Sequence, residues 1–320
     1  MGRGTTPGGR QSTNITRGGY VPSYAENEPI GVDWNNFKGN LRDRLRKAIP
    51  YSPSEPWTKR ISQTWREPDI ISDDKYLSWD NIMPDFEHLF LSDEQVDIFV
   101  ERFCLDNNLP EINNAYFDIL SVRRIFKADF VRYLLIYIRG GIWADIDTTA
   151  KKHFNDWLAP ANGTDVGFIT GMEMDWNEKG SNLEDKKHGD WNENNHRRCL
   201  TQYIFAAKAG HPALLEMIAR LVDSAVTIRH HAQFNKNINV GHMTGPDFMT
   251  SVLIEWVHKR FHPTFDVKDE LHNQDEPIIF GDLMIYPIWA FGAGQRHSNS
   301  PPLSDPRILA VHHFQATPLN

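Results

Sequence analysis

The most apolar stretch of the chain is residues 130–138, which lies inside a predicted buried helix at 128–139. This helix contains neither Gly nor Pro, and its apolar residues recur around most of the circumference, which is typical of a core helix. Gly140 and Gly141 are expected to end it, because Gly adopts the left-handed conformation that a helix C-terminus favours. Residues 142–146 are apolar and rich in β-forming side chains, which indicates a short buried strand.

The rest of the chain alternates between predicted strands and predicted helices. The strands are predicted at residues 60–65, 88–91, 166–170, two short runs within 278–286, and 308–314. The helices are predicted at residues 76–83, 93–103 with Ser92 or Asp93 as N-cap, 200–208, 212–226, and from Pro246 to about Arg260. Strands that alternate with helices favour parallel pairing, so we expect an α/β fold with a Rossmann-like, mainly parallel sheet flanked by helices.

Two acidic residues, Asp145 and Asp147, stand at the end of the predicted strand 142–146. Side chains in a strand alternate with a period of two, so the two carboxylates are expected to point the same way. Ligands of parallel sheets bind at the carboxyl ends of the strands, and two carboxylates there suit a hard divalent cation. A cation held in this way, with open coordination positions, would in turn hold a diphosphate.

The predicted core helix carries two charged residues, Asp129 and Arg132, which are three positions apart and therefore share a face. Charged groups on an apolar helix are costly to bury unless they pair or bind a polar ligand. One interpretation is an internal ion pair, with Asp145 and Asp147 solvated at the strand end. The other is a single ligand site that uses all of these side chains. The full set consists of Asp129, Arg132, the glycine pair and the Asp145-x-Asp147 motif. It is a more specific sign of a ligand site than an isolated Asp-x-Asp.

Residues 128–148, ADFVRYLLIYIRGGIWADIDT, resemble the core of the DXD-containing sugar transferases. Members of that family include the fungal initiation-specific α-1,6-mannosyltransferases of the Golgi. Residues 41–65, 209–212 (AGHP), 243–246 (MTGP) and 312–314 (HHF) agree with the resemblance, which runs from about residue 41 to the C-terminus. The resemblance implies a GT-A fold, a nucleotide-sugar donor, a manganese-type cation (Mn²⁺ or Mg²⁺) and retention of anomeric configuration.

The resemblance also implies roles for the charged side chains. Asp147 is expected to bind the cation directly, and Asp145 to bind it through water or to hold the ribose or sugar of the donor. Asp129 and Arg132 are expected to position donor hydroxyls, with Arg132 adding positive charge near the phosphates. His312 is a further candidate for contact with the metal or the phosphates.

Other candidates follow two of the predicted strands. Trp65 ends the first predicted strand and is a candidate to stack on the nucleotide base of the donor, with a plain core tryptophan as the alternative. Glu173, Asp175 and Trp176 come after the predicted strand 166–170 and are candidates on the acceptor side, with solvated loop charges as the alternative. A polar loop that carries Trp176 is of interest because sugar faces stack on indole rings.

The resemblance thus implies a metal-dependent retaining glycosyltransferase that transfers mannose from GDP-mannose to a glycan acceptor, as in the outer chain of N-glycans. One alternative is a transferase that uses a UDP-sugar, because nothing in the sequence identifies the base or the sugar. Another is an inactive relative that serves as a partner subunit of a glycosyltransferase complex. Ser62 and Pro318 depart from the family pattern and favour this second alternative slightly, but the intact set of Asp129, Arg132, Asp145 and Asp147 disfavours it more. Retention of anomeric configuration would need either a carboxylate nucleophile or attack from the same face of the sugar, and the sequence does not distinguish these two mechanisms.

Composition narrows the class of protein further. Of the 320 residues, 40% are hydrophobic, which is enough for the core of one domain over residues 41–320. Residues 1–40 are rich in Gly, Ser, Thr, Asn and Pro and are expected to form a flexible, stem-like extension. With 34 basic against 42 acidic residues and no long basic cluster, a nucleic-acid partner is not expected.

The sequence gives few signs of a cellular location. No apolar run approaches the roughly 20 residues that a membrane-spanning helix needs, and the first residues lack the apolar region of a signal peptide. The resemblance nevertheless implies the Golgi lumen. Asn14 and Asn162 each begin an N-glycosylation sequon, a pattern that matters only in a secretory compartment.

Overall fold

The computed structural model describes residues 15–16, 19–20, 34–67, 70, 73–175, 198–234, 239–265, 270–295 and 300–315. At its centre lies an eight-stranded sheet with the strand order β10-β11-β7-β9-β5-β3-β4, and β8 pairs with β7 beside this path. Its strands are β3 (Arg60–Trp65), β4 (Glu87–Ser92), β5 (Gly141–Ala144), β7 (Phe168–Asp175), β8 (Arg198–Leu200), β9 (Ile204–Ala207), β10 (Ile278–Phe280) and β11 (Leu283–Tyr286). Two small strands near the N-terminus, β1 (Ile15–Thr16) and β2 (Gly19–Tyr20), pair with each other.

Most strands of this sheet run in one direction. Strand β3 is parallel to both β4 and β5, and β11 is parallel to β7. Strand β9 lies between β5 and β7 and is antiparallel to both, so β5 and β7 also share a direction. The predicted α/β fold with a mainly parallel sheet is therefore confirmed, with antiparallel strands at β8, β9 and β10.

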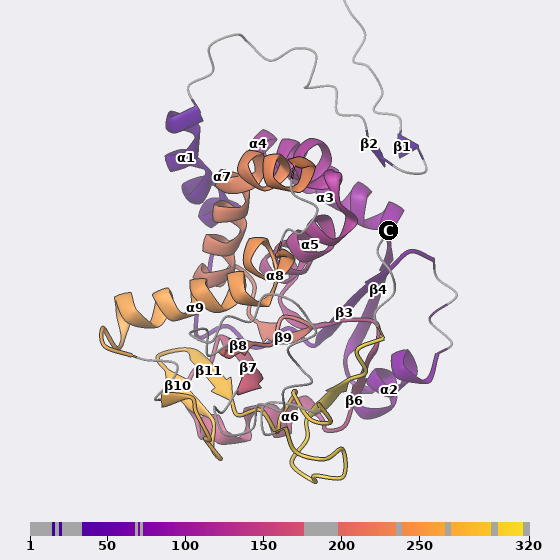
Figure 1. Ribbon diagram of the computed structural model, residues 1–320, viewed down its shortest axis with the longest axis vertical. Coiled ribbons are helices and arrows are strands. Elements are labelled where there is room, and N and C mark those ends of the chain that lie inside the picture. Colours follow the sequence, from indigo (N-terminus) through magenta and orange to yellow (C-terminus); the bar gives the residue numbers. More distant parts are fainter. Residues whose placement is uncertain are drawn as a thin grey trace, which may run out of the picture.

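Helices cover the sheet on both faces (Figure 1). The helices are α1 (Trp34–Ala48), α2 (Asp74–Ile82), α3 (Asp93–Asn107), α4 (Pro110–Asn114), α5 (Arg124–Arg139), α6 (Phe154–Leu158), α7 (Pro212–Phe234), α8 (Val240–Met243) and α9 (Pro246–Arg260). One apolar cluster packs α1, α3, α5, α7 and α9 against one face, and a smaller one packs α2 and α6 against the other. None of the helices described is both long enough and apolar enough to cross a membrane.

The predicted helix at 200–208 is wrong, because this segment forms β8 and β9. Strand β9 is fully buried between β5 and β7, and the Phe205 ring stacks on Phe168 with centroids 5.7 Å apart. A short apolar run buried on both faces has no periodicity that separates a strand from a helix. Pairing with two neighbouring strands therefore decides the conformation against the helix preference of its alanines.

The predicted strand 142–146 is too long at its end. Strand β5 stops at Ala144, and residues 145–147 form a turn in which the carbonyl of Asp145 accepts from both the N–H and the hydroxyl of Thr148. The chain then enters β6 (Thr148–Ala150), which pairs antiparallel with the last strand, β12 (Ala310–His312). The acidic residues therefore lie on a turn, and strand alternation is the wrong reason for their shared direction.

The glycine pair is required where α5 turns into β5. Gly140 (φ +64°) donates its N–H to the Ile136 carbonyl, and Gly141 (φ +97°) lies so close to β3 that an added Cβ would stand 2.4 Å from the Arg60 carbonyl oxygen. This contact fixes the start of β5 and hence the position of the acidic turn at its end.

We expect Gly141→Ala to lower the free energy of unfolding by about 3 kcal/mol, because positive φ and a backbone clash both oppose the new methyl group. Gly163→Ala is the matched control, since Gly163 also has positive φ (+86°) but nothing within 4 Å of its added Cβ. Its cost should be about 1–2 kcal/mol, from the backbone strain alone. Urea unfolding of both variants measures the difference, and equal costs would contradict the close approach to β3.

Candidate functional site

The acidic turn meets the last strand at the carboxyl end of β5. Ligand atoms of Asp145, Asp147 and His312 all lie within 4.8 Å of one another, and the three side chains are partly buried. The pairing of β12 with β6 places His312 opposite Thr148, directly beside the turn. Two carboxylates and one imidazole are a donor set for a divalent cation. The structure thus brings together all three of the candidate metal ligands that the sequence predicted.

Asp147 is held ionised at this site. Its Oδ1 lies 3.0 Å from His312 Nε2, and its Oδ2 accepts from the Gln315 N–H at 2.9 Å. Burial disfavours the charged carboxylate, but His312 and the backbone donors outweigh this and keep the pKa of Asp147 below its usual range. Among the described residues His312 Nδ1 is buried without a hydrogen bond, while the ring stacks on Tyr203. The residues fit a cation such as Mn²⁺, which accepts carboxylate oxygen and imidazole nitrogen.

Arg132 joins the core helix to the acidic turn. Its Nη2 lies 3.4 Å from Asp129 Oδ1 and 3.4 Å from Asp145 Oδ1, and all but 8% of the side chain is buried. Asp145 Oδ1 also accepts from Trp143 Nε1 at 2.7 Å. Burial disfavours the guanidinium charge, but the two carboxylates outweigh it and raise the pKa of Arg132. Asp129, Arg132 and Asp145 therefore form one charged network, rather than an isolated pair beside solvated aspartates.

Three polar side chains that were not among the predicted site residues support this network. Thr244 donates its hydroxyl to Asp129 Oδ2 at 2.5 Å, and Gln202 Nε2 donates to the Tyr133 hydroxyl at 2.6 Å and to the Thr244 carbonyl at 3.0 Å. Gln202 is missed from the sequence because residues 200–208 are predicted as a helix, whereas they form the end of β8 and all of β9. Thr244 lies in the MTGP motif just before α9, so the motif marks a contact to Asp129.

Burial has a measurable effect on Asp129. Burial raises the pKa of Asp129 from 3.8 to about 6, although Arg132 and Thr244 favour the charged form; the Asp145 charge adds to the rise. Because the folded-state pKa lies above the ordinary value, the contribution of Asp129 to stability is greatest at low pH. This contribution is lost as the pH rises through about 6.

We therefore expect Asp129→Asn, which stays neutral, to gain on the wild type as the pH rises. The difference in unfolding free energy, variant minus wild type, should grow by about 1.4 kcal/mol between pH 5 and pH 7, which corresponds to about one pKa unit. Urea unfolding at both pH values measures it, with the exposed Asp156→Asn as control. A difference that shrinks over this range would mean that Arg132 lowers the pKa of Asp129.

Trp65 occupies the last position of β3 and is half-buried, with the Arg66 guanidinium 5.7 Å from its ring centroid. Its strand pairs with β5, which leads directly into the acidic turn. Ser62, three residues earlier, is fully buried, and among the described residues its hydroxyl has no hydrogen-bond partner. The stacking of Trp65 on a nucleotide base stays a prediction.

The acceptor-side candidates lie differently from what the sequence predicted. The strand predicted at 166–170 is β7, which runs on to Asp175, so Glu173 and Asp175 are strand residues rather than loop residues. Asp175 is 2% exposed and faces His272 Nδ1 at 2.6 Å, and it also accepts from the Asn273 N–H. Solvated loop charge is therefore the wrong description of Asp175. Glu173 contributes to raising the pKa of Arg132 and thus lies near the charged network, whereas Trp176 is outside the described residues.

Comparison with known proteins agrees with this site. Residues 72–163, which include Asp129, Arg132 and the acidic turn, match the family described as glycosyltransferase sugar-binding region containing DXD motif. The chain is thus related to the DXD-containing glycosyltransferases, and the resemblance expected from the sequence is confirmed.

Among individual relatives, it is 31% identical over 277 residues to the initiation-specific α-1,6-mannosyltransferase of Schizosaccharomyces pombe, covering 85% of this chain and 66% of that protein. It is 27% identical over 313 residues to the enzyme of the same name from Candida albicans, covering 88% and 77%. The chain therefore spans slightly less than two thirds of the S. pombe protein. Among solved structures, the PaToxG glycosyltransferase matches 70% of this chain and 76% of its own, with 17% identity and a TM-score of 0.40.

Proposed function

We propose that this chain is a metal-dependent, retaining glycosyltransferase of the GT-A type that transfers mannose from GDP-mannose to a glycan hydroxyl. The observation that carries the proposal is the single network of Asp129, Arg132 and Asp145 next to the Asp147–His312 pair. This network lies at the carboxyl end of β5, where ligands of such sheets bind. The names of the relatives, initiation-specific α-1,6-mannosyltransferases, support mannose as the sugar. The outer chain of N-glycans in the Golgi lumen is the setting that we propose with it.

In this proposal the residues of the site have different roles, which follow from their chemistry. Asp147, Asp145 and His312 would hold Mn²⁺ or Mg²⁺, which when bound supplies positive charge for the leaving diphosphate. Arg132 is fixed between two carboxylates, so its own charge is oriented before the donor arrives. Asp129, held by the Thr244 hydroxyl, would accept a hydrogen bond from a hydroxyl of the donor. Orientation of the donor by fixed groups lowers the entropic cost of reaching the transition state.

Metal-dependent nucleotide binding is the experiment that tests the proposal. Calorimetric titration with GDP and with UDP, each with and without Mn²⁺, should show that GDP binds at least about tenfold more tightly with the metal. A preference for UDP would replace GDP-mannose by a UDP-sugar as donor. Binding that is equally tight without metal would contradict the assignment of Asp145, Asp147 and His312.

Turnover separates an enzyme from an inactive partner subunit of a glycosyltransferase complex. Purified protein incubated with GDP-mannose, Mn²⁺ and a mannose oligosaccharide should form mannosylated acceptor together with some free mannose from donor hydrolysis. The ratio of the two products reports how well water is excluded from the site. Neither product, in a chain that binds GDP with the metal, would identify an inactive relative.

A further inference from the structure

A pocket lies at the opposite edge of the sheet from the acidic turn. Its volume is about 290 Å³. It is lined by residues 54–57, 158, 161, 163–166 and 208. These segments come just before β3, just before β7 and just after the antiparallel β9, so the pocket is at the amino ends of the parallel strands. The length of β5, roughly 13 Å at 3.3 Å per residue, separates this edge from the acidic turn.

Lys208 brings an incompletely paired charge to this pocket. The residue is 6% exposed, and its ammonium donates to the Pro53 carbonyl. Burial lowers the pKa of Lys208, against the attraction of Asp165, Asp282 and Glu55, yet among the described residues it forms no ion pair with a carboxylate. An ammonium has three N–H donors, so the pocket offers donors that call for an acceptor.

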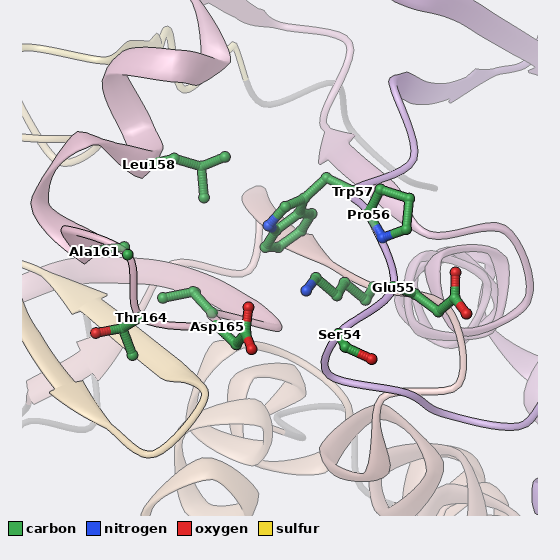
Figure 2. A pocket seen from close by; sticks show the side chains of 11 residues that line it. Ser54, Glu55, Pro56, Trp57, Leu158, Ala161, Thr164 and Asp165 are labelled. Carbon is green, nitrogen blue, oxygen red and sulfur yellow. The ribbon is translucent and has the colours of Figure 1, made fainter.

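The other walls supply an aromatic ring and an acid. Figure 2 shows Trp57 and Asp165 on opposite sides of the pocket. Trp57 is partly exposed, and the Lys208 ammonium lies 5.8 Å from its ring centroid, while Asp165 is exposed. A hydroxyl between Lys208 and Asp165 would accept from the ammonium and donate to the carboxylate. An anion there would meet the like charge of Asp165, and a cation that of Lys208.

We propose that this pocket binds a carbohydrate at a site separate from the transfer site. A pyranose offers an apolar face for the indole of Trp57 and neighbouring hydroxyls that bridge Lys208 and Asp165. The volume lies just below the roughly 300–1,000 Å³ that small-molecule sites occupy, which suits a ligand of monosaccharide size. One part of a glycan bound in this pocket would hold the glycan to the protein, while its other sugars would lie outside the pocket.

The sugar has two possible sources. One is a separate oligosaccharide. The other is a glycan on the chain itself, because Asn162 begins a sequon, is exposed in a turn with φ +44°, and is followed by Gly163 and Thr164, which line the pocket. Both present the same chemistry to Trp57, and they differ in whether the protein is modified.

The test titrates the full chain, made in a bacterial host without N-glycans, with α-1,6-linked mannotriose, and with maltotriose and chitotriose for comparison. The choice of mannose rests on the proposed function. Metal and nucleotide are left out, so a failure here leaves the transfer proposal untouched. We expect saturable binding of at least one trisaccharide, followed by calorimetry or by ligand-observed nuclear magnetic resonance.

Variants locate the binding. Asp165→Ala and Lys208→Met should each raise Kd at least fivefold, whereas the exposed Asp156→Ala and the transfer-site variant Asp147→Asn should leave it unchanged. Because Trp57 also packs against the core, Trp57→Ala is used only if it keeps the wild-type circular dichroism. Absence of saturable binding for all three sugars would overturn the proposal. So would binding that Asp147→Asn abolishes and Asp165→Ala leaves intact.

A second arm assigns the source of the sugar. Protein from a yeast secretory host is compared with its Asn162→Gln variant by peptide mass spectrometry and by the same titration. A glycan on Asn162 that blocks mannotriose until a glycosidase removes it would identify the chain's own glycan as occupant. Equal mannotriose binding in both proteins would identify a separate oligosaccharide.

Discussion

Asp147→Asn is expected to abolish metal-dependent nucleotide binding and, with it, sugar transfer. Asn keeps the shape and the acceptor oxygen that faces His312 but loses the negative charge that a divalent cation requires. The affinity for GDP in the presence of Mn²⁺ should fall by on the order of 100-fold, at or beyond the upper end of what the loss of a supporting contact costs. Calorimetry with saturating Mn²⁺ measures this fall.

The protein fold should survive this change. Asp147 links the acidic turn to the C-terminal segment through His312 and the Gln315 N–H, and the amide oxygen of Asn preserves one of these acceptors. We expect a loss of about 1–2 kcal/mol in unfolding free energy. Asp156→Asn, an exposed acid on α6, is the control for the loss of one negative charge. Wild-type GDP affinity in Asp147→Asn would remove Asp147 from the metal site.

Much of the fold around the site follows from local sequence signals. The glycine pair ends α5 where predicted, and Ser92 caps α3 with a full capping box. Helix α9 begins at Pro246, after Gly245 at the N-cap. Caps and glycines act over a few residues, so the sequence around them contains the whole cause of the conformation.

What the sequence could not predict depends on pairing between distant segments. The segment 204–207 becomes a strand only because β5 and β7 lie on either side of it, and this places Gln202 beside Tyr133 and Thr244. In the same way, His312 reaches Asp147 because β12 pairs with β6. Hydrophobic periodicity contains no signal for such register.

The acidic turn shows how side chains can converge as predicted for a different structural reason. Asp145 and Asp147 do converge with His312, as expected for metal ligands, but they do so across a turn that Thr148 closes onto the Asp145 carbonyl. Asp145 points toward Arg132 and Trp143, whereas Asp147 points toward His312. The two carboxylates therefore have different surroundings, which favours different tasks for them in the proposed binding of the donor.

Arg132→Lys is expected to reduce transfer by about 10²–10³-fold, the scale of losing one preorganised donor at a developing charge. The guanidinium of Arg132 reaches Asp129 and Asp145 at once, at 3.4 Å each, and its Nη1 approaches the Gln202 carbonyl at 3.5 Å. A lysine ammonium is a compact charge on a flexible stem and cannot reproduce the planar fork.

Removing one partner of a buried ion pair lowers the free energy of unfolding by about 3–5 kcal/mol. Because Arg132→Lys keeps its positive charge, its loss of unfolding free energy should be smaller. Arg139→Lys, an exposed position at the end of the same helix, is the matched control and should keep full activity. Initial rates with GDP-mannose and unfolding curves for both variants measure the two effects separately. If Arg132→Lys turns over at the wild-type rate, Arg132 serves only to tie α5 to the acidic turn, and the donor must be held by other groups.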